Sequence, residues 1–210
     1  MPSIRRFLDE GTVDLRRDFE YAPEIQRLLL GHCPLAAYRK LLEGLRRGFA
    51  VVELQAFEDL PDHALQVLRA KRSTWRLSHD IDILGGTVAL PARQADIDNA
   101  GAFDSWSAKL GAHFAMAHIL EILSRARTTI ETSFGCALVS CLLFTRPPGT
   151  RFTSAVDQLI DQARPELDWA EALAGARRTL RTIRQGLVER GPTQGEPCSP
   201  AEPRYSAASA

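Results

Sequence analysis

Residues 34–49 read PLAAYRKLLEGLRRGF, and this stretch decides the fold class. Its apolar residues recur at three- and four-residue steps: Leu35, Tyr38, Leu41, Leu42, Leu45 and Phe49. That spacing places them on one stripe of an α-helix. Pro34 stands where a first-turn proline is tolerated, because the first backbone N–H groups of a helix have no partner inside it. We therefore predict a helix that begins near residue 34 and buries this stripe.

The same periodicity recurs along the chain. One stretch runs from Pro61 to about Leu84, where Gly85-Gly86 supplies residues that end helices. Another begins at Phe103 and continues to about Ser133. Near the C-terminus we expect a helix capped by Thr153 or Ser154, and after Pro165 a last helix that ends at Gly191.

Other segments lack this pattern. Residues 87–99 are typical of a connection, and Val139–Phe144 is an apolar run that fits a strand or a buried helix, of which we favour a helix followed by a loop. Sustained strand alternation and fixed-period repeats are absent. We predict an all-α, single-domain bundle of about seven helices over residues 12–190. Residues 1–11 are expected to form an N-terminal arm, and the Pro/Ser/Ala-rich residues 191–210 a disordered tail.

Composition removes several classes of function. The 210 residues carry 26 Lys+Arg and 26 Asp+Glu, so the formal charge is zero and no basic field attracts nucleic acid or anionic lipid. Neither a membrane span nor a signal peptide is visible, so we expect a cytoplasmic protein with no nucleic-acid or membrane partner. The four cysteines (Cys33, Cys136, Cys141 and Cys198) form no CxxC pair. We therefore expect reduced, mostly structural thiols, and Cys136 and Cys141 to be inert and buried.

Common catalytic motifs are missing. The sequence contains no Walker loop, GxGxxG, HExxH or GxSxG motif. His113 and His118 share one long predicted helix, but a five-residue spacing turns their side chains about 140° apart, which is awkward for binding one metal ion. We favour structural roles for these histidines and predict no metal site.

Arginines line the last predicted helix. Arg177, Arg181 and Arg184 follow one another at three- and four-residue steps beside its apolar stripe. A solvated charged face explains them, and so does an anion site to which Arg16 and Arg17 contribute from another helix, because guanidinium groups suit carboxylates.

Five motifs in order point to a family. They are Leu15-Arg16; Tyr38–Leu45 with Gly48-Phe49 and Glu53; Trp75–Asp80 with Asp82 and Leu84-Gly85; His118-Ile119-Leu120-Glu121; and Ala174–Arg177. Together they resemble the bacterial heme oxygenase family, most closely its phytochrome-associated members, over most of residues 12–190. The resemblance implies a heme-oxygenase-like helical bundle. It also implies oxygen-dependent opening of heme to biliverdin, with heme as substrate and cofactor, an external electron donor and a phytochrome-type partner.

The resemblance also implies site residues, and several of these depart from the family. The histidine that ligates heme iron corresponds to Pro23, which has no nitrogen lone pair to offer and suits the start of a new helix. The glycine-rich distal run corresponds to residues 122–127, with Ile122, Ala126 and Arg127 at glycine positions. The bulky side chains of Ile122 and Arg127 would fill space that glycine leaves open. Arg16, and Arg177 or Arg181, correspond to partners for the heme propionates.

Three readings follow. The first is an active heme oxygenase. The second is a non-catalytic protein of the same fold that binds a tetrapyrrole, an apolar ligand or a protein partner. The third class comprises thiaminase-like proteins with a cysteine nucleophile and di-iron oxidases, but the chain lacks a helical Glu-x-x-His pair. Glu53 and Glu121 are candidates for buried carboxylates on facing helices, and we expect Pro23 to lie opposite Ile122 across a common cleft.

Overall fold

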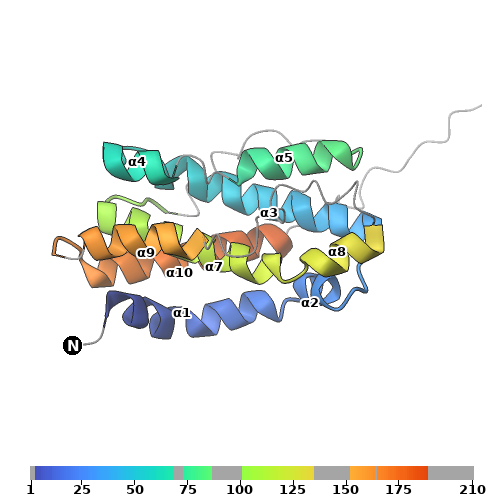
Figure 1. Cartoon of the computed structure of the whole chain (residues 1–210), viewed down its shortest axis with the longest axis horizontal. Coiled ribbons are helices and arrows are strands. Elements are labelled where there is room, and N and C mark those ends of the chain that lie inside the picture. Colours follow the sequence, from blue (N-terminus) through green and yellow to red (C-terminus); the bar gives the residue numbers. More distant parts are fainter. Residues whose placement is uncertain (1–2, 69–72, 87–100, 135–151, 164, 189–210) are drawn as a thin grey trace, which may run out of the picture.

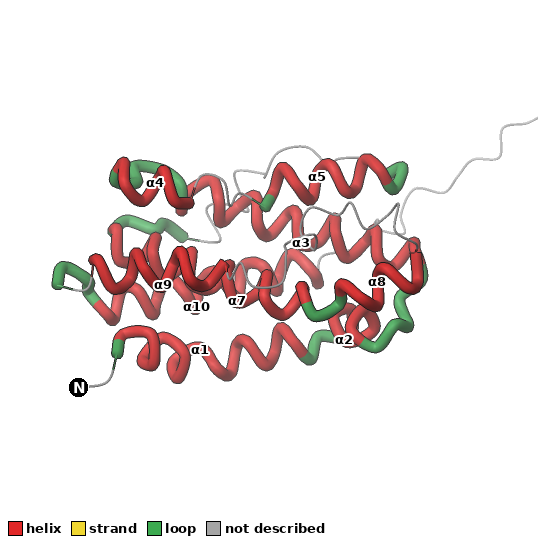
Figure 2. The backbone as a smooth tube through the Cα atoms, viewed as in Figure 1, coloured by secondary structure: helices red, strands yellow, loops and turns green. Residues whose placement is uncertain are grey.

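The fold is all-α in the part of the chain that the structure describes. A computed structural model describes residues 3–68, 73–86, 101–134, 152–163 and 165–188. These residues form helices joined by loops, without a strand among them (Figure 2). The helices are α1 (Ile4–Glu20), α2 (Pro23–Leu29), α3 (Leu35–Ala56), α4 (Asp62–Leu68), α5 (Thr74–Ile83), α7 (Trp106–Ser124), α8 (Arg127–Phe134), α9 (Phe152–Ala163) and α10 (Trp169–Val188). The all-α prediction is confirmed, although the described residues hold nine helices rather than about seven.

Two of the predicted stretches are each divided into two helices. The stretch from Phe103 breaks after α7, where the N–H groups of Arg125 and Ala126 donate to carbonyls three residues back and form a tight turn. Ala126 is fully buried at this turn, so core packing holds the bend. The stretch from Pro61 yields α4 and α5, with residues 69–72 outside the described part. Periodicity misses such breaks because the apolar spacing continues across them.

The N-terminal region is helical earlier than predicted. Ser3 caps α1 by accepting the N–H of Arg6, so residues 4–11, assigned above to an arm, form the first turns of α1. Ile4 and Leu8 are each 1% exposed, which shows that these turns pack on the bundle. A new helix starts at Pro23, as predicted, with the proline at its first position.

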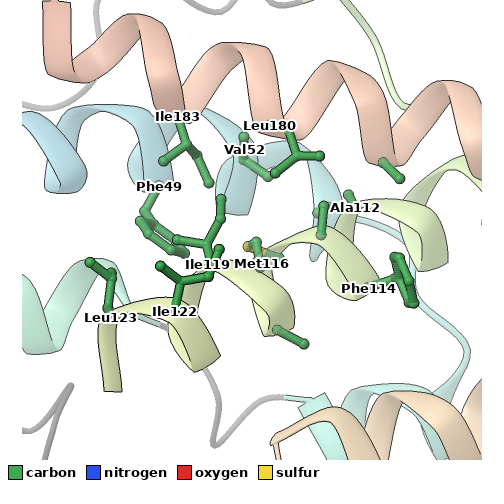
Figure 3. Packing of buried hydrophobic residues seen from close by; sticks show 14 of the residues in the cluster. Phe49, Val52, Ala112, Phe114, Met116, Ile119, Ile122, Leu123, Leu180 and Ile183 are labelled. Carbon is green, nitrogen blue, oxygen red and sulfur yellow. The ribbon is translucent and has the colours of Figure 1, made fainter. Parts of the chain in front are cut away.

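The bundle is built around α7. This helix is apolar on almost every face, as expected of a helix that others surround, and most of its residues are buried. Helix α5 packs along α3 and α4 contacts α9; α4 and α5 lie on one side of the molecule, and α1 and α2 lie on the opposite side (Figure 1). Figure 3 shows side chains from α3, α7 and α10 meeting in one core, with Phe49, Ile119 and Ile183 close together.

Close helix contacts depend on glycine. A Cβ added at Gly111 on α7 would meet the backbone of Ala172 on α10. In the same way, a Cβ added at Gly175 on α10 would meet the backbone of Ala108 on α7. Likewise, Gly48 on α3 lies against the backbone of Ile183. Because only glycine permits this approach, α10 is held directly against both α7 and α3.

Some predictions fall outside the described residues. These are the connection at 87–99, the run Val139–Phe144, the thiols of Cys136, Cys141 and Cys198, the helix end at Gly191 and the tail at 191–210. Thr153 and Ser154, proposed as caps, lie inside α9, whose first residue is Phe152. Among the described helices, none combines the length and apolar character needed to cross a bilayer.

Candidate functional site

The resemblance directs attention to the space between α1 and α7, because it places the heme between the first helix and the distal helix. In the structure, side chains from both helices fill this boundary with a network of charges. We call it the α1–α7 seam and define it by Asp9 and Arg16 on α1 and His118 and Glu121 on α7. Asp9 and Arg16 are seven residues apart, two helical turns, so both face α7. His118 and Glu121 are three apart and share one face of α7.

His118 is at the centre of the seam. Its Nε2 lies 3.4 Å from Oδ1 of Asp9, and its Nδ1 lies 3.3 Å from Nη1 of Arg16. A guanidinium group has only donors, so Nδ1 must accept and the proton of a neutral ring belongs on Nε2, facing the carboxylate. The side chain is 13% exposed. Burial, and then the positive charge of Arg16, hold the pKa of His118 below its ordinary value, against the opposing effects of Asp9 and Glu121.

Arg16 ties the seam together. Its Nη1 lies 3.0 Å from Oδ1 of Asp9, and its Nη2 donates to the backbone carbonyl of Asp9 at 2.7 Å. The two hydrogens on Nη1 can therefore serve Asp9 and His118 at once. As a result, the guanidinium expected to hold a heme propionate is already engaged by this chain's own groups.

Ion pairs extend the network in both directions along α1. At its N-terminal end, Arg5 Nη1 lies 2.9 Å from Oδ2 of Asp157 on α9, and burial raises the pKa of that carboxyl. At its C-terminal end, Glu20 Oε1 lies 2.8 Å from Nη1 of Arg125, just beyond α7. Charged contacts thus hold α1 to α7 and α9 along most of its length.

The positions implied for iron ligation and heme contact do not fit an iron-bound heme. Pro23 is exposed at the start of α2 and has no donor atom for iron. In contrast, Ile122 is 5% exposed and lies in the hydrophobic core (Figure 3), and Ala126 is fully buried in the same core. Pro23 is therefore at the surface, whereas Ile122 lies in the core. The imidazole of the seam, His118, has both ring nitrogens engaged.

The arginines of α10 are divided between internal contacts and the surface. Arg177 Nη1 donates to the carbonyl of Gly11 at 2.6 Å, and its Nη2 donates to Asp14 at 3.0 Å. Against the opposing effect of burial, backbone hydrogen bonds and then the guanidinium of Arg177 lower the pKa of Asp14. Arg184 lies 4.0 Å from Glu24, whereas Arg181 is exposed. Of these three arginines, Arg177 and Arg184 therefore link α10 to α1 and α2, and Arg181 lies on the solvated face.

The remaining candidates have structural surroundings. His113 is fully buried; its Nε2 lies 3.1 Å from the carbonyl of Ala56, and burial lowers its pKa to about 4. Glu53 is also buried and accepts the N–H groups of Ser73 and Thr74, which caps α5. Glu121 has a side chain that is 55% exposed, so of the two candidates for a buried carboxylate only Glu53 is buried. Within the described ranges, no group of three His, Cys, Asp or Glu side chains could hold a metal ion.

Sequence reasoning singled out Arg16 and His118 but missed Asp9 and Asp157. The available signal was the seven-residue spacing of Asp9 and Arg16, which places opposite charges on one helix face. Their partners on α7 and α9 are more than a hundred residues away in the chain, so only the folded arrangement could identify them.

No protein family model matches this chain, and a search of curated proteins finds no significant relative.

Proposed function

We propose that this chain is a non-catalytic binding protein, with a helical bundle that resembles the heme oxygenases, and that it does not ligate heme iron. The observation that carries this proposal is the exposed Pro23 at the start of α2, where the resemblance expects the iron ligand. Axial ligation by histidine is what the heme oxygenases use to position the ring, and proline has no lone pair to replace it.

The seam supports the same conclusion from the distal side. For His118 to ligate iron through Nδ1, Arg16 would have to withdraw from its 3.3 Å contact; through Nε2, Asp9 would have to withdraw from 3.4 Å. Either change would separate a half-buried charged group from its partner, which is costly. Heme opening, with its external electron donor, is therefore the less favoured function.

Of the binding functions left open, the structure favours a protein partner over a buried tetrapyrrole or apolar ligand. The core between α3, α7 and α10 is filled by the chain's own side chains, including Ile122 at a position where the family has glycine (Figure 3). At the surface, Tyr21 is 70% exposed and Leu30 65% exposed, and exposed aromatic and aliphatic side chains are common anchors in protein interfaces. A phytochrome-type partner, implied by the resemblance, belongs to this proposal.

A hemin titration of the purified chain, followed by absorbance, tests the central claim. We expect broad, weak absorbance without a sharp Soret band, and no biliverdin spectrum after a reductant is added in air. A sharp Soret band at stoichiometric hemin would overturn the proposal. In that case, His118→Ala would identify the ligand by abolishing the band, while His79→Ala, which changes an exposed histidine on α5, is the matched control.

A further inference from the structure

The seam contains a side chain with two alternative partners for one nitrogen. Nδ1 of His118 lies 3.3 Å from Nη1 of Arg16 and 3.9 Å from Oε2 of Glu121. The first is a donor and the second an acceptor, so the partner that suits Nδ1 depends on whether this nitrogen carries a proton.

Neutral His118 suits Arg16. With the ring proton on Nε2 facing Asp9, the lone pair of Nδ1 accepts from Nη1, and every group in the contact has a complementary partner. Protonation places a hydrogen on Nδ1 directly against the Nη1 hydrogens and sets two positive charges 3.3 Å apart. Arg16 must then move away, whereas Glu121 needs only to close from 3.9 Å to ordinary hydrogen-bond distance.

We propose that His118 is a proton-operated latch on α1, holding Arg16 when neutral and exchanging it for Glu121 when protonated. In the neutral state, the imidazole joins the Asp9–Arg16 pair of α1 to α7. In the protonated state, Nδ1–H is held by Glu121 on the same helix as His118, so this polar link to Arg16 across the seam is broken. The latch does not depend on what the bundle binds, and it stands or falls separately from the proposed function.

Charged groups on three helices face the latch. Arg5, Asp9 and Arg16 approach from α1 and Glu121 from α7 itself. On α9, Asp157 pairs with Arg5 and lies near Asp161. Arg5 and Arg16 oppose the protonated ring, and Asp9 and Glu121 favour it. Among the residues that the structure describes, Glu121 is the acceptor that approaches Nδ1, so it decides how readily the exchange occurs.

The ring's surroundings limit the exchange to the Nδ1 side. Phe114, one turn earlier on α7, packs against the imidazole with ring centroids 4.5 Å apart. Apolar contacts of Ile4, Leu8 and Phe19 hold α1 on the core independently of the latch. Because Nε2 keeps its contact with Asp9 in both states, release of Arg16 loosens α1 only around Arg16 and leaves the rest of the bundle folded.

The first test follows the ring nitrogens of His118 by NMR as the pH is lowered. We expect the Nε2–H form at about pH 8 and a midpoint below the ordinary histidine value of about 6.5. Glu121→Gln removes the negative acceptor and should lower the midpoint, whereas Arg16→Gln removes the opposing cation and should raise it. A neutral ring protonated on Nδ1, or a midpoint unaffected by Glu121→Gln, would overturn the latch.

The second test measures whether protonation loosens α1. Amide hydrogen exchange is compared between about pH 7.5 and about pH 5 after correction for intrinsic rates, with α1 protection expressed relative to α10 in the same sample. We expect this ratio to fall at least about threefold at the lower pH. Normalising to α10 removes any global change caused by His113, which is buried elsewhere.

Two variants make the second test specific. His118→Gln replaces the imidazole by an amide of similar size that does not titrate in this range. It should therefore abolish the pH response of α1. Asp157→Asn, which alters the neighbouring Arg5 pair without touching the imidazole, should retain it. A wild-type ratio that does not change with pH, or a response that persists in His118→Gln, would contradict the proposal.

Discussion

Replacing Gly111 by alanine tests the packing on which the whole bundle depends. Gly111 lies on α7 where α10 crosses it, and an added Cβ would be 2.7 Å from the carbonyl carbon of Ala172, 3.0 Å from its Cα and closer still to its oxygen. These are backbone atoms, so no side-chain rotation can relieve the contact. The two helices would have to separate.

The size of the effect follows from the distances. Ordinary contact begins at 3.4 Å, so the carbonyl carbon must retreat by at least 0.7 Å, and the oxygen by more. Overpacking of a tight core costs about 1–3 kcal/mol and sometimes more. Alanine regains about 1 kcal/mol of helix propensity. Because α10 is also held against Gly48 on α3, it cannot move freely, and we expect a net loss of about 2 kcal/mol.

Denaturant unfolding followed by circular dichroism measures this loss, and a fall of about 4–8 °C in the thermal midpoint should accompany it. Gly11→Ala is the matched control, because its added Cβ would meet the side chain of Leu173, with Cδ1 at 2.6 Å. That side chain can rotate, so we expect Gly11→Ala to remain within about 1 kcal/mol of wild type. A Gly111→Ala variant that is as stable as the wild-type protein would refute the close approach of α7 and α10.

Two further predictions concern buried polar groups. Glu53→Gln should lower the free energy of unfolding by about 1–3 kcal/mol, because the carboxylate accepts the N–H groups of Ser73 and Thr74 at the start of α5; an unchanged urea midpoint would contradict this role. His113 is neutral in the folded protein, with a pKa of about 4 against 6.5 ordinarily, so the unfolded chain binds more protons between these values. The contribution of His113 to the free energy of unfolding is complete above about pH 6.5. It decreases by up to about 3 kcal/mol as the pH falls to about 4. Urea unfolding at several pH values should show this slope, and His113→Gln should reduce it; an equal slope in both proteins would argue against it.

The charged contacts of the seam support the proposal that this bundle binds a partner rather than heme. The resemblance leads one to expect a ring between α1 and α7, held by an imidazole on one side and guanidinium groups at its edge. Here Arg16 and His118 satisfy each other and Asp9, while Arg177 is engaged by Asp14 and Gly11. Groups that could bind a carboxylate ligand instead join helices, and this favours function at the surface of the protein.

Local sequence signals predicted the helices better than the points at which a helical stretch is interrupted. Pro23 marks the start of α2 because proline favours the first position of a helix wherever it occurs. The turn at Ala126 was not predicted, since its cause is burial against distant residues rather than a local helix-breaking residue. For the same reason, residues 4–11 gave no sign that Ile4 and Leu8 would reach the core.

By itself, the sequence determined that this protein is helical, where most of its apolar stripes lie, and that Pro23 cannot ligate a metal, because periodicity and side-chain chemistry are local properties. Only the tertiary structure decided which charges meet. Asp9, Arg16 and His118 form a site because α1 and α7 lie side by side, and that contact is selected by packing between residues about a hundred positions apart.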